Sequence, residues 1–229
     1  GARVSSLFRW SAFKGFFGAT LIVVLLILPW TIRNYRAFGT FVPLNTNAGY
    51  AFFWGNHPIY GSRFVGLLPS GAQGYYDLIP EDLRHLNEAD LDRALLEQGL
   101  GFVTADPRRF VLLSLSRARE YFKFWPSSQS GTISNISRVG SFGILLPFML
   151  YGLWVSATLV KGPRHVGQQA QMILLYLFIV VYAAIHLVSW ALIRYRLPVD
   201  AVLLLFVALG LETLAIRFRL LPPTENGPR

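Results

Sequence analysis

Four long apolar blocks constrain this chain most. They lie at residues 13–30, 142–160, 172–193 and 199–216, and a polar stretch of roughly a hundred residues separates the first block from the second. As helices, such blocks are long enough to cross most of a bilayer core of about 30 Å. Only 14% of the residues are charged and 53% are hydrophobic, a balance that favours a membrane protein over a soluble domain. The sequence therefore predicts a mainly α integral membrane protein with four transmembrane helices.

The predicted segments follow one another along the chain. A cytoplasmic basic flank (1–14) precedes the first span (15–30), and an outer insert (31–138) leads to the second span (139–160). Next come a cytoplasmic loop (161–171), the third span (172–193), an outer turn (194–198), the fourth span (199–216) and a cytoplasmic tail (217–229). The large insert between the first two spans is therefore predicted to lie outside the membrane.

The first span is expected to end at the membrane surface. Pro29 gives up a helix hydrogen bond and Trp30 prefers the headgroup layer, so the pair indicates an interfacial stop. Glycines and prolines are frequent over residues 31–74, and this density favours turns with short strands at 40–43 and 50–54. The start of the insert is therefore predicted to contain no long helix.

Helices are expected in the later part of the insert. Asn87 is a suitable N-cap for one helix, and Asp106 followed by Pro107 is a suitable start for a second. The second helix leads into the aromatic sequence FKFWP, which suits a headgroup layer, and residues 127–140 form a predicted serine-rich linker back to the bilayer. The insert is thus predicted to be α-rich and to lie flat on the membrane.

The distribution of positive charge predicts the orientation. The net charge is +9, but the insert carries eleven basic and nine acidic residues and so contributes only +2. Most of the remaining excess lies in clusters at 3–14, 161–164 and 217–229, which four spans place on one side. The positive-inside rule assigns that side to the cytoplasm. We expect a protein of a bacterial inner (plasma) membrane with both termini cytoplasmic and the insert outside, and this pattern argues against nucleic acid as a partner.

Two arginines in the outer turn depart from this charge pattern. Arg194 and Arg196 flank Tyr195 between the closely spaced third and fourth spans. Because a guanidinium fork matches phosphate oxygens, a lipid-linked phosphate or diphosphate is a natural partner. An ordinary anchor to anionic headgroups is the alternative. Arg33 and Arg36, which leave the first span on the same side, are expected to converge with them.

His186 is an ionisable residue near the outer half of the third span. An intramembrane histidine is a candidate ligand for a metal or cofactor, which would make the chain a cofactor-holding membrane subunit. No second histidine, cysteine or carboxylate stands at ligand spacing, and the chain contains no cysteine at all. An interhelical hydrogen bond is therefore the favoured role for His186.

The segment at residues 29–58, PWTIRNYRAFGTFVPLNTNAGYAFFWGNHP, resembles a segment of bacterial polytopic glycosyltransferases with the GT-C fold. These are the protein-O-mannosyltransferase-like and aminoarabinose-transferase-like enzymes, which use polyprenyl-phosphate sugars. The likeness extends to FKFWPS at 122–127 and to IRYRLP at 193–198, and it covers nearly all of this chain. It implies the C-terminal portion of such an enzyme, since members of the family are commonly longer.

The resemblance implies a set of binding residues. Lipid-phosphate or substrate binding is implied for Arg33, Asn34, Asn47, Asn56, Arg194, Tyr195 and Arg196. The family's catalytic carboxylate is expected in an earlier outer loop. In this chain Asp200 is the one carboxylate close to the outer turn and the one candidate, although pairing with Arg194 or Arg196 explains it equally.

No cofactor of this chain can be identified from its sequence. In the resembled family an acidic residue acts as a base toward the acceptor or helps to hold a metal, so a divalent metal is an expectation for the full-length enzyme. The catalytic residue of this chain stays unknown, with Asp200 as its only candidate. The implied partners are membrane lipid and a polyprenyl-phosphate sugar.

Two functions follow from these observations. In the first, the chain is part of a membrane glycosyltransferase and supplies lipid-phosphate and substrate binding. In the second, it is a shortened and catalytically inactive relative that serves as a structural or accessory subunit of a larger membrane complex, with other subunits as partners. An assay of sugar transfer from polyprenyl-phosphate donors separates the two functions, because only the first predicts transfer.

Overall fold

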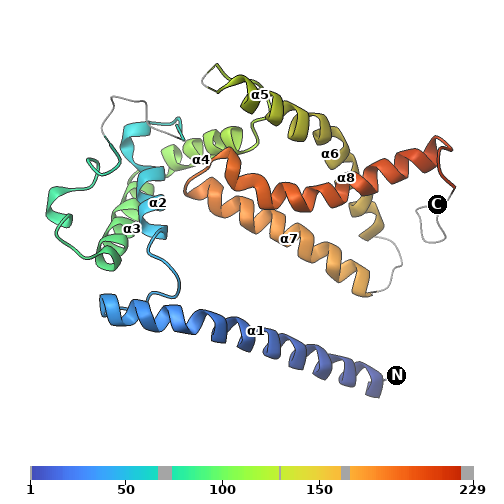
Figure 1. Ribbon diagram of the computed structural model, residues 1–229, viewed down its shortest axis with the longest axis horizontal. Helices are drawn as coiled ribbons and strands as arrows, with labels where there is room; N and C mark the ends of the chain where they lie inside the picture. The colour runs from blue at the N-terminus through green and yellow to red at the C-terminus, as the bar shows by residue number, and fades with distance from the viewer. Residues whose placement is uncertain (1, 67–73, 129, 161–165, 223–229) are drawn as a thin grey trace. The chain divides into compact units, whose positions relative to one another are not determined.

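The structure, a computed structural model, describes residues 2–66, 74–128, 130–160 and 166–222 (Figure 1). Within these ranges the regular structure is helical and no strand occurs. Four described segments are long and apolar enough to cross a membrane, and they are Phe13–Phe38, Thr132–Thr158, Gln169–Val188 and Ile193–Arg217. The predicted mainly α membrane protein with four membrane-spanning helices is therefore confirmed. The predicted loop at 161–171 and the predicted tail at 217–229 lie partly outside the described residues.

The chain divides into two compact units. Unit 1 comprises Gly1–His57 and Leu68–Ala105, and unit 2 comprises Pro58–Leu67 and Asp106–Arg229. The helices of unit 1 are α1 (Ala2–Phe38), α2 (Ala48–Asn56), the short η2 (Glu81–Leu83) and α3 (Glu88–Ala105). Those of unit 2 are η1 (Pro58–Tyr60), α4 (Pro107–Tyr121), α5 (Thr132–Arg138), η3 (Val139–Gly143), α6 (Ile144–Val160), α7 (Val166–Val188), η4 (Ile193–Arg196) and α8 (Leu197–Arg217).

The first helix is longer than the sequence predicted. α1 continues through Pro29 and ends at Phe38, so the predicted stop at Pro29 and Trp30 is wrong. A proline removes one amide donor, and a helix in an apolar environment tolerates this where neighbouring groups supply other bonds. Trp30 is not a stop signal here but a contact between α1 and the segment that follows it. Its indole Nε1 donates to the carbonyl oxygen of Leu44 at 2.6 Å.

A reversal after α1 explains where the helix ends. Gly39 has φ +70°, which favours glycine, and its amide donates to the carbonyl oxygen of Tyr35 at 2.9 Å. The returning chain runs along the last turns of α1. There the Asn34 amide nitrogen donates to the carbonyl oxygens of Val42 and Leu44, at 3.1 and 3.0 Å.

Both short strands predicted after the first span are wrong. Residues 40–43 form no regular element, and residues 50–54 belong to α2. The aromatic residues Tyr50, Phe53 and Trp54 recur at helical spacing, and the burial of this face outweighs the breaker density on which the strand prediction depended. The core of unit 1 consists of Phe53, Leu78, Ile79, Leu91 and Leu95.

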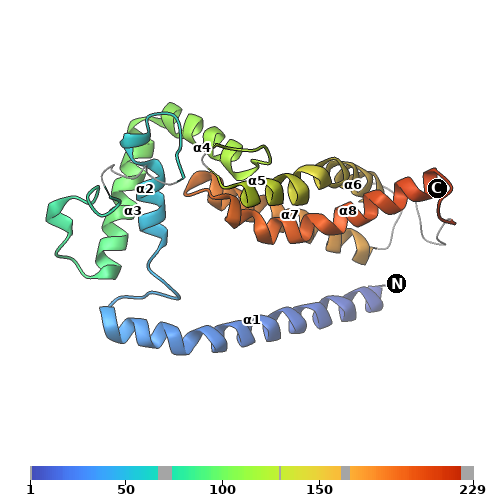
Figure 2. The same ribbon diagram turned by 45° about the horizontal axis from the view of Figure 1, so that its top comes forward.

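α2 and α3 lie side by side at very short range (Figures 1 and 2). A Cβ atom on Gly49 would overlap the main-chain carbonyl of Asp92, and a Cβ on Gly99 would lie 3.2 Å from the Cα of Phe53. Glycine at both positions therefore sets the distance between the two helices. This close contact gives unit 1 a compact helical pair.

Both predicted helix starts in the insert are confirmed. The Asn87 side-chain oxygen accepts hydrogen bonds from the amides of Ala89 and Asp90, each at 3.0 Å. The Asp106 carboxylate accepts a bond from the amide of Arg109 at 2.9 Å. These bonds satisfy amides that have no partner within their own helix.

Asp92 of α3 caps the start of α2 from the neighbouring helix. Its Oδ1 accepts the amide of Tyr50 at 3.1 Å, and the amide of Gly49 donates to the same carboxylate. Asn47, at the N-cap position of α2, makes no side-chain cap bond. Asp92 therefore supplies the acceptor that this helix start requires.

Replacing Asp92 with alanine should destabilise unit 1 by about 1–2 kcal/mol, because two amides lose their acceptor. D92N keeps an acceptor oxygen and should cost less.

Burial raises the pKa of Asp92, although the two amide bonds lower it. The unfolded chain therefore releases this proton first, and the stability of wild type relative to D92N should fall as pH rises through the raised pKa. Thermal unfolding of the three proteins at several pH values measures both effects, and equal losses in D92A and D92N would contradict the capping role.

In unit 2, α6 and α8 pack closely around two glycines. A Cβ on Gly152 would overlap the main-chain carbonyl of Phe206, and a Cβ on Gly210 would lie 2.9 Å from the carbonyl oxygen of Phe148. Small residues at such crossings let helix backbones approach, which is typical of packing in membranes. The core around this crossing consists of Phe142, Met149, Val199, Leu203, Phe206 and Val207.

The predicted serine-rich linker at 127–140 is largely ordered. Its described part contains α5, and the apolar helical segment that is long enough to form the second span begins at Thr132. Arg138 organises this segment: its Nη1 donates to the Trp125 carbonyl oxygen at 3.1 Å, and its Nη2 donates to the hydroxyl of Ser130 at 2.9 Å. The π-helical turn η3 then joins α5 to α6.

Candidate functional site

The turn between α7 and α8, which the charge pattern predicts to be on the outer side and which keeps the name outer turn, is the short 3-10 segment η4. The chain is extended at Leu192, with φ −127° and ψ 151°, and the amide of Tyr195 then donates to the Leu192 carbonyl oxygen at 3.0 Å. Pro198 lies in the first turn of α8, where its fixed φ suits a helix start. The turn is therefore ordered by its own backbone before any side chain is considered.

Arg196 fastens this turn to its surroundings. Its side chain is buried, and its Nε donates to both carboxylate oxygens of Asp200, at 2.9 and 3.1 Å. Its Nη1 donates to the carbonyl oxygen of Tyr121 at 2.9 Å, and its guanidinium carbon lies 3.4 Å from the centroid of the Phe142 ring. The predicted pairing of Asp200 with an arginine of the turn is confirmed for Arg196.

Arg194 differs from Arg196 in its surroundings. Its side chain is exposed, and its guanidinium carbon lies 5.4 Å from the centroid of the Tyr195 ring. Within the part of the chain that the structure describes, no ion pair involves Arg194. Of the two arginines predicted to bind phosphate, Arg194 is thus the one that presents its guanidinium outward.

Aromatic rings support the turn beside Arg194. Tyr195 stacks on His186 with 4.9 Å between ring centroids, and Tyr121 stacks on His186 at 6.1 Å. The Tyr121 hydroxyl donates to the carbonyl oxygen of Tyr195 at 3.4 Å. Burial, aided by the charges of Tyr182 and Asp200, raises the pKa of Tyr121 to about 12, so its hydroxyl keeps its proton at neutral pH. The stack holds Tyr195, and with it the turn, in one orientation.

Among the residues that the structure describes, His186 makes a hydrogen bond within its own segment, and no hydrogen bond to another span is seen there. Its Nδ1 lies 3.2 Å from the carbonyl oxygen of Trp190, four residues further along the chain. The ring of Tyr182 also contacts His186, at 5.0 Å between centroids. The described residues contain no group of three or more histidine, aspartate or glutamate side chains that could hold a metal ion.

The predicted site residues of unit 1 include two buried and two exposed side chains. Asn34 and Asn56 are buried, and the Asn56 amide nitrogen donates to the carbonyl oxygen of Phe52 at 2.9 Å. Arg33 and Asn47 are exposed, and Arg33 Nη1 donates to the Asn34 side-chain oxygen at 3.0 Å. Asn34 and Asn56 therefore shape the backbone, while Arg33 and Asn47 present polar groups to the exterior.

The expected convergence of Arg33 and Arg36 with the outer turn stays a prediction. Both residues belong to unit 1, whereas Arg194, Tyr195 and Arg196 belong to unit 2. Within unit 2, Arg194 is exposed, Tyr195 is partly buried and Arg196 is buried.

Sequence reasoning missed Tyr121, which supports the turn from α4. The helical spacing of Leu113, Arg117 and Tyr121 placed all three on one face, and all three are buried. What the spacing did not reveal is that the carbonyl and hydroxyl groups of Tyr121 bind two residues of the outer turn. The signal in the sequence that could have indicated such contacts is the presence of Arg117 and Tyr121 on the same face as Leu113.

The charged side chains of the turn differ in whether another side chain already pairs with them. Asp200 is the carboxylate beside it, and both of its oxygens already accept bonds from Arg196. Arg194, by contrast, offers an exposed fork of N–H donors next to a tyrosine ring. A guanidinium fork matches the oxygen atoms of a phosphate or a carboxylate.

No family model, curated protein or solved structure matches this chain. The geometry of the outer turn and the motif resemblance are therefore the grounds on which a function is proposed.

Proposed function

We propose that this chain forms the lipid-phosphate-binding part of a membrane glycosyltransferase, which moves a sugar from a polyprenyl-phosphate donor. The resemblance of residues 29–58 and 193–198 to GT-C glycosyltransferases supports the reaction class. In this proposal the donor phosphate binds Arg194 at the outer turn, and Tyr195 flanks it. The chain supplies binding, and Asp200 serves Arg196 as a structural partner rather than acting as a base.

One observation carries the proposal: an exposed arginine stands on a turn that a second, buried arginine fixes in place. Arg196 and Asp200 hold the turn from within, so Arg194 projects from an ordered backbone. A preordered cation loses less conformational freedom when it binds a ligand than one on a flexible loop does. This ordered backbone supports the proposal that Arg194 binds a phosphate at the end of two spans.

The proposed location is a bacterial inner membrane, with the turn and the insert on the outer side. The clusters of basic residues at 3–14, 161–164 and 217–229 support this orientation through the positive-inside rule. Arg33 and Asn47, which are exposed, are proposed to bind the sugar or the acceptor. Asn34 and Asn56 support that surface through their bonds to the backbone.

Replacing Arg194 with alanine should weaken the binding of a polyprenyl phosphate about 10- to 100-fold, because a charge-assisted bond to the phosphate is lost. The matched control is Arg217→Ala, which removes an exposed arginine from the other end of α8. Native mass spectrometry of the purified chain in detergent, titrated with polyprenyl phosphate and with phosphatidylglycerol, measures the effect. Equal loss in both variants, or equal affinity for both lipids, would show that Arg194 is only a headgroup anchor.

The second function is that of a catalytically inactive accessory subunit. The engagement of Asp200 by Arg196 favours it, because this carboxylate is the candidate base that the sequence offers next to the turn. Purification from the native membrane, followed by a sugar-transfer assay, separates the two functions. Copurification with a large unrelated complex and no transfer from polyprenyl-phosphate donors would establish the accessory role.

A further inference from the structure

α4 differs from a helix at a protein–water surface, because it buries a charged residue and exposes aliphatic residues. The residues that face the protein include Arg117, which is 0% exposed and lies between Leu113 and Tyr121 on the same face. The residues that face outward include Leu115, which is 63% exposed, and Val111, which is 54% exposed. A buried arginine and an exposed aliphatic face both require an explanation.

The position of α7 explains the buried arginine. Arg117 Nη1 donates to the carbonyl oxygen of Leu187, in the last turn of α7, at 3.1 Å. The guanidinium carbon also lies 5.3 Å from the centroid of the Phe64 ring. Burial, and to a smaller extent the charge of Arg109, lowers the pKa of Arg117 to about 10, so it still carries its charge at neutral pH. That charge lies at the negative end of the α7 helix dipole, where a cation is stabilising.

Two further contacts fix α4 at the end of the spans. The hydroxyl of Tyr121 donates to the carbonyl oxygen of Tyr195 in η4, and Arg196 donates to the carbonyl oxygen of Tyr121. The C-terminal half of α4 is thus bonded to the end of α7 and to the turn before α8. Both ribbon views show this part of α4 next to the adjoining ends of α7 and α8 (Figures 1 and 2). Since α7 and α8 are spans, these contacts place α4 at the level where the bilayer surface lies.

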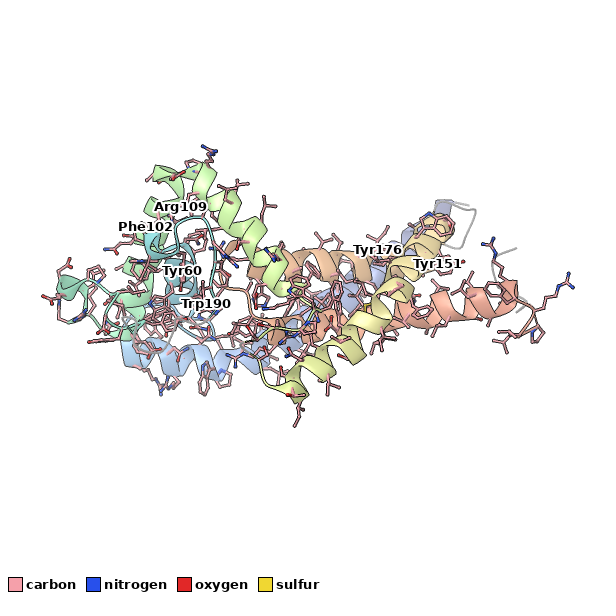
Figure 3. All side chains as sticks on the ribbon, turned by 90° about the horizontal axis from the view of Figure 1, so that it is seen from above. Tyr60, Phe102, Arg109, Tyr151, Tyr176 and Trp190 are labelled. Carbon is pink, nitrogen blue, oxygen red and sulfur yellow. The ribbon has the colours of Figure 1, made fainter. Side chains whose placement is uncertain are left out.

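A chain of aromatic residues packs on the same end of α7. Tyr60 contacts Phe64 at 5.5 Å between ring centroids, and Phe64 meets Trp190 edge to face at 5.5 Å. Tyr60 and Trp190, the two ends of this chain of rings, are labelled in Figure 3. The amide of Phe64 donates to the hydroxyl of Ser116 on α4 at 3.0 Å. The inward side of α4 is therefore covered by protein, and its outward face is the side that remains for another partner.

We infer that the outward face of α4 rests on the outer surface of the lipid bilayer. Val111, Leu112 and Leu115 would enter the boundary between headgroups and acyl chains, and the exposed Arg108 and Arg119 would bind anionic headgroups. A face that combines aliphatic side chains with arginines fits such a boundary, since each group meets its preferred medium. The inference stands independently of the proposed sugar transfer.

The absence of cysteine from the chain allows a clean test. L115C, labelled with an environment-sensitive fluorophore and placed with the full chain in nanodiscs, should show blue-shifted emission. A quencher carried on the lipid should reduce that emission severalfold more than aqueous iodide does. E120C is the matched control, because Glu120 lies on a different side of the same helix and is partly exposed. Its label should respond mainly to iodide.

The arginines can be tested in the same system. In nanodiscs that contain phosphatidylglycerol, R108Q/R119Q should reduce the quenching of L115C by the lipid-borne quencher, because two headgroup contacts are lost. Quenching of L115C by iodide to the same extent as E120C would overturn the inference. Shielding of L115C from both quenchers would overturn it as well, since the face would then be covered by a second copy or by another protein.

Discussion

Replacing Arg196 with methionine should destabilise unit 2 by about 3–5 kcal/mol, because the change leaves a partly buried carboxylate without its partner. Asp200 loses both hydrogen bonds to its oxygens, and the carbonyl of Tyr121 loses a donor. The side chain of Arg196 is only 3% exposed, so water cannot replace these bonds without opening the turn. Thermal and denaturant unfolding in detergent, followed by circular dichroism, measures the loss.

Two variants make the Arg196 prediction specific. Arg194→Ala removes an exposed arginine from the same turn and should change stability by no more than about 0.5 kcal/mol. R196M/D200L removes both charges of the pair and should recover part of the stability that R196M loses. An R196M protein as stable as wild type would show that Arg196 does not hold the turn.

Replacing Gly152 with leucine should prevent α6 and α8 from packing and leave little folded protein. Even the first atom of a side chain at this position would overlap the main-chain carbonyl of Phe206, and backbone cannot move aside as a flexible side chain can. G152A should already cost about 1–3 kcal/mol through the same overlap. The amount of monodisperse protein in fluorescence-detected size-exclusion chromatography, with melting temperatures for the variants that survive, measures the series.

Gly140 provides the control for this series. It lies in η3 of the same span, and no atom stands within 4 Å of the position that its Cβ would take. G140A should therefore fold as wild type does. Similar losses in G140A and G152A would show that the effect comes from local helix conformation, and the close crossing of α6 and α8 would then not be the cause.

The spans and helix caps were predictable because their signals are local. Unbroken apolar runs identify helices in lipid, and the side chains of Asn87 and Asp106 identify helix starts. The strand prediction at 50–54 failed because burial of an aromatic face against α3 decides the structure of α2. The end of α1 was misjudged because Trp30 and Asn34 bind a segment that folds back only after Gly39.

The residue types of the candidate site could be predicted from the sequence, but the different role of each arginine could not. Two arginines beside a span predicted a phosphate partner for both, yet Arg196 faces inward to Asp200 and Arg194 faces outward. The two side chains point in different directions because of the 3-10 geometry of η4, which the sequence does not specify. The role of Tyr121 depends on contacts between segments more than seventy residues apart, so periodicity alone could not reveal it.

The measurement that tests the central proposal most directly is photo-crosslinking with a polyprenyl phosphate that carries a diazirine next to the phosphate. After irradiation of the chain in nanodiscs and proteolysis, the label should map to residues 193–197 of wild type and should be greatly reduced in R194A. The corresponding polyprenol, which lacks the phosphate, should not label this segment. Labelling around Arg217 at the other end of α8, or equal labelling by the polyprenol, would contradict phosphate binding at the outer turn.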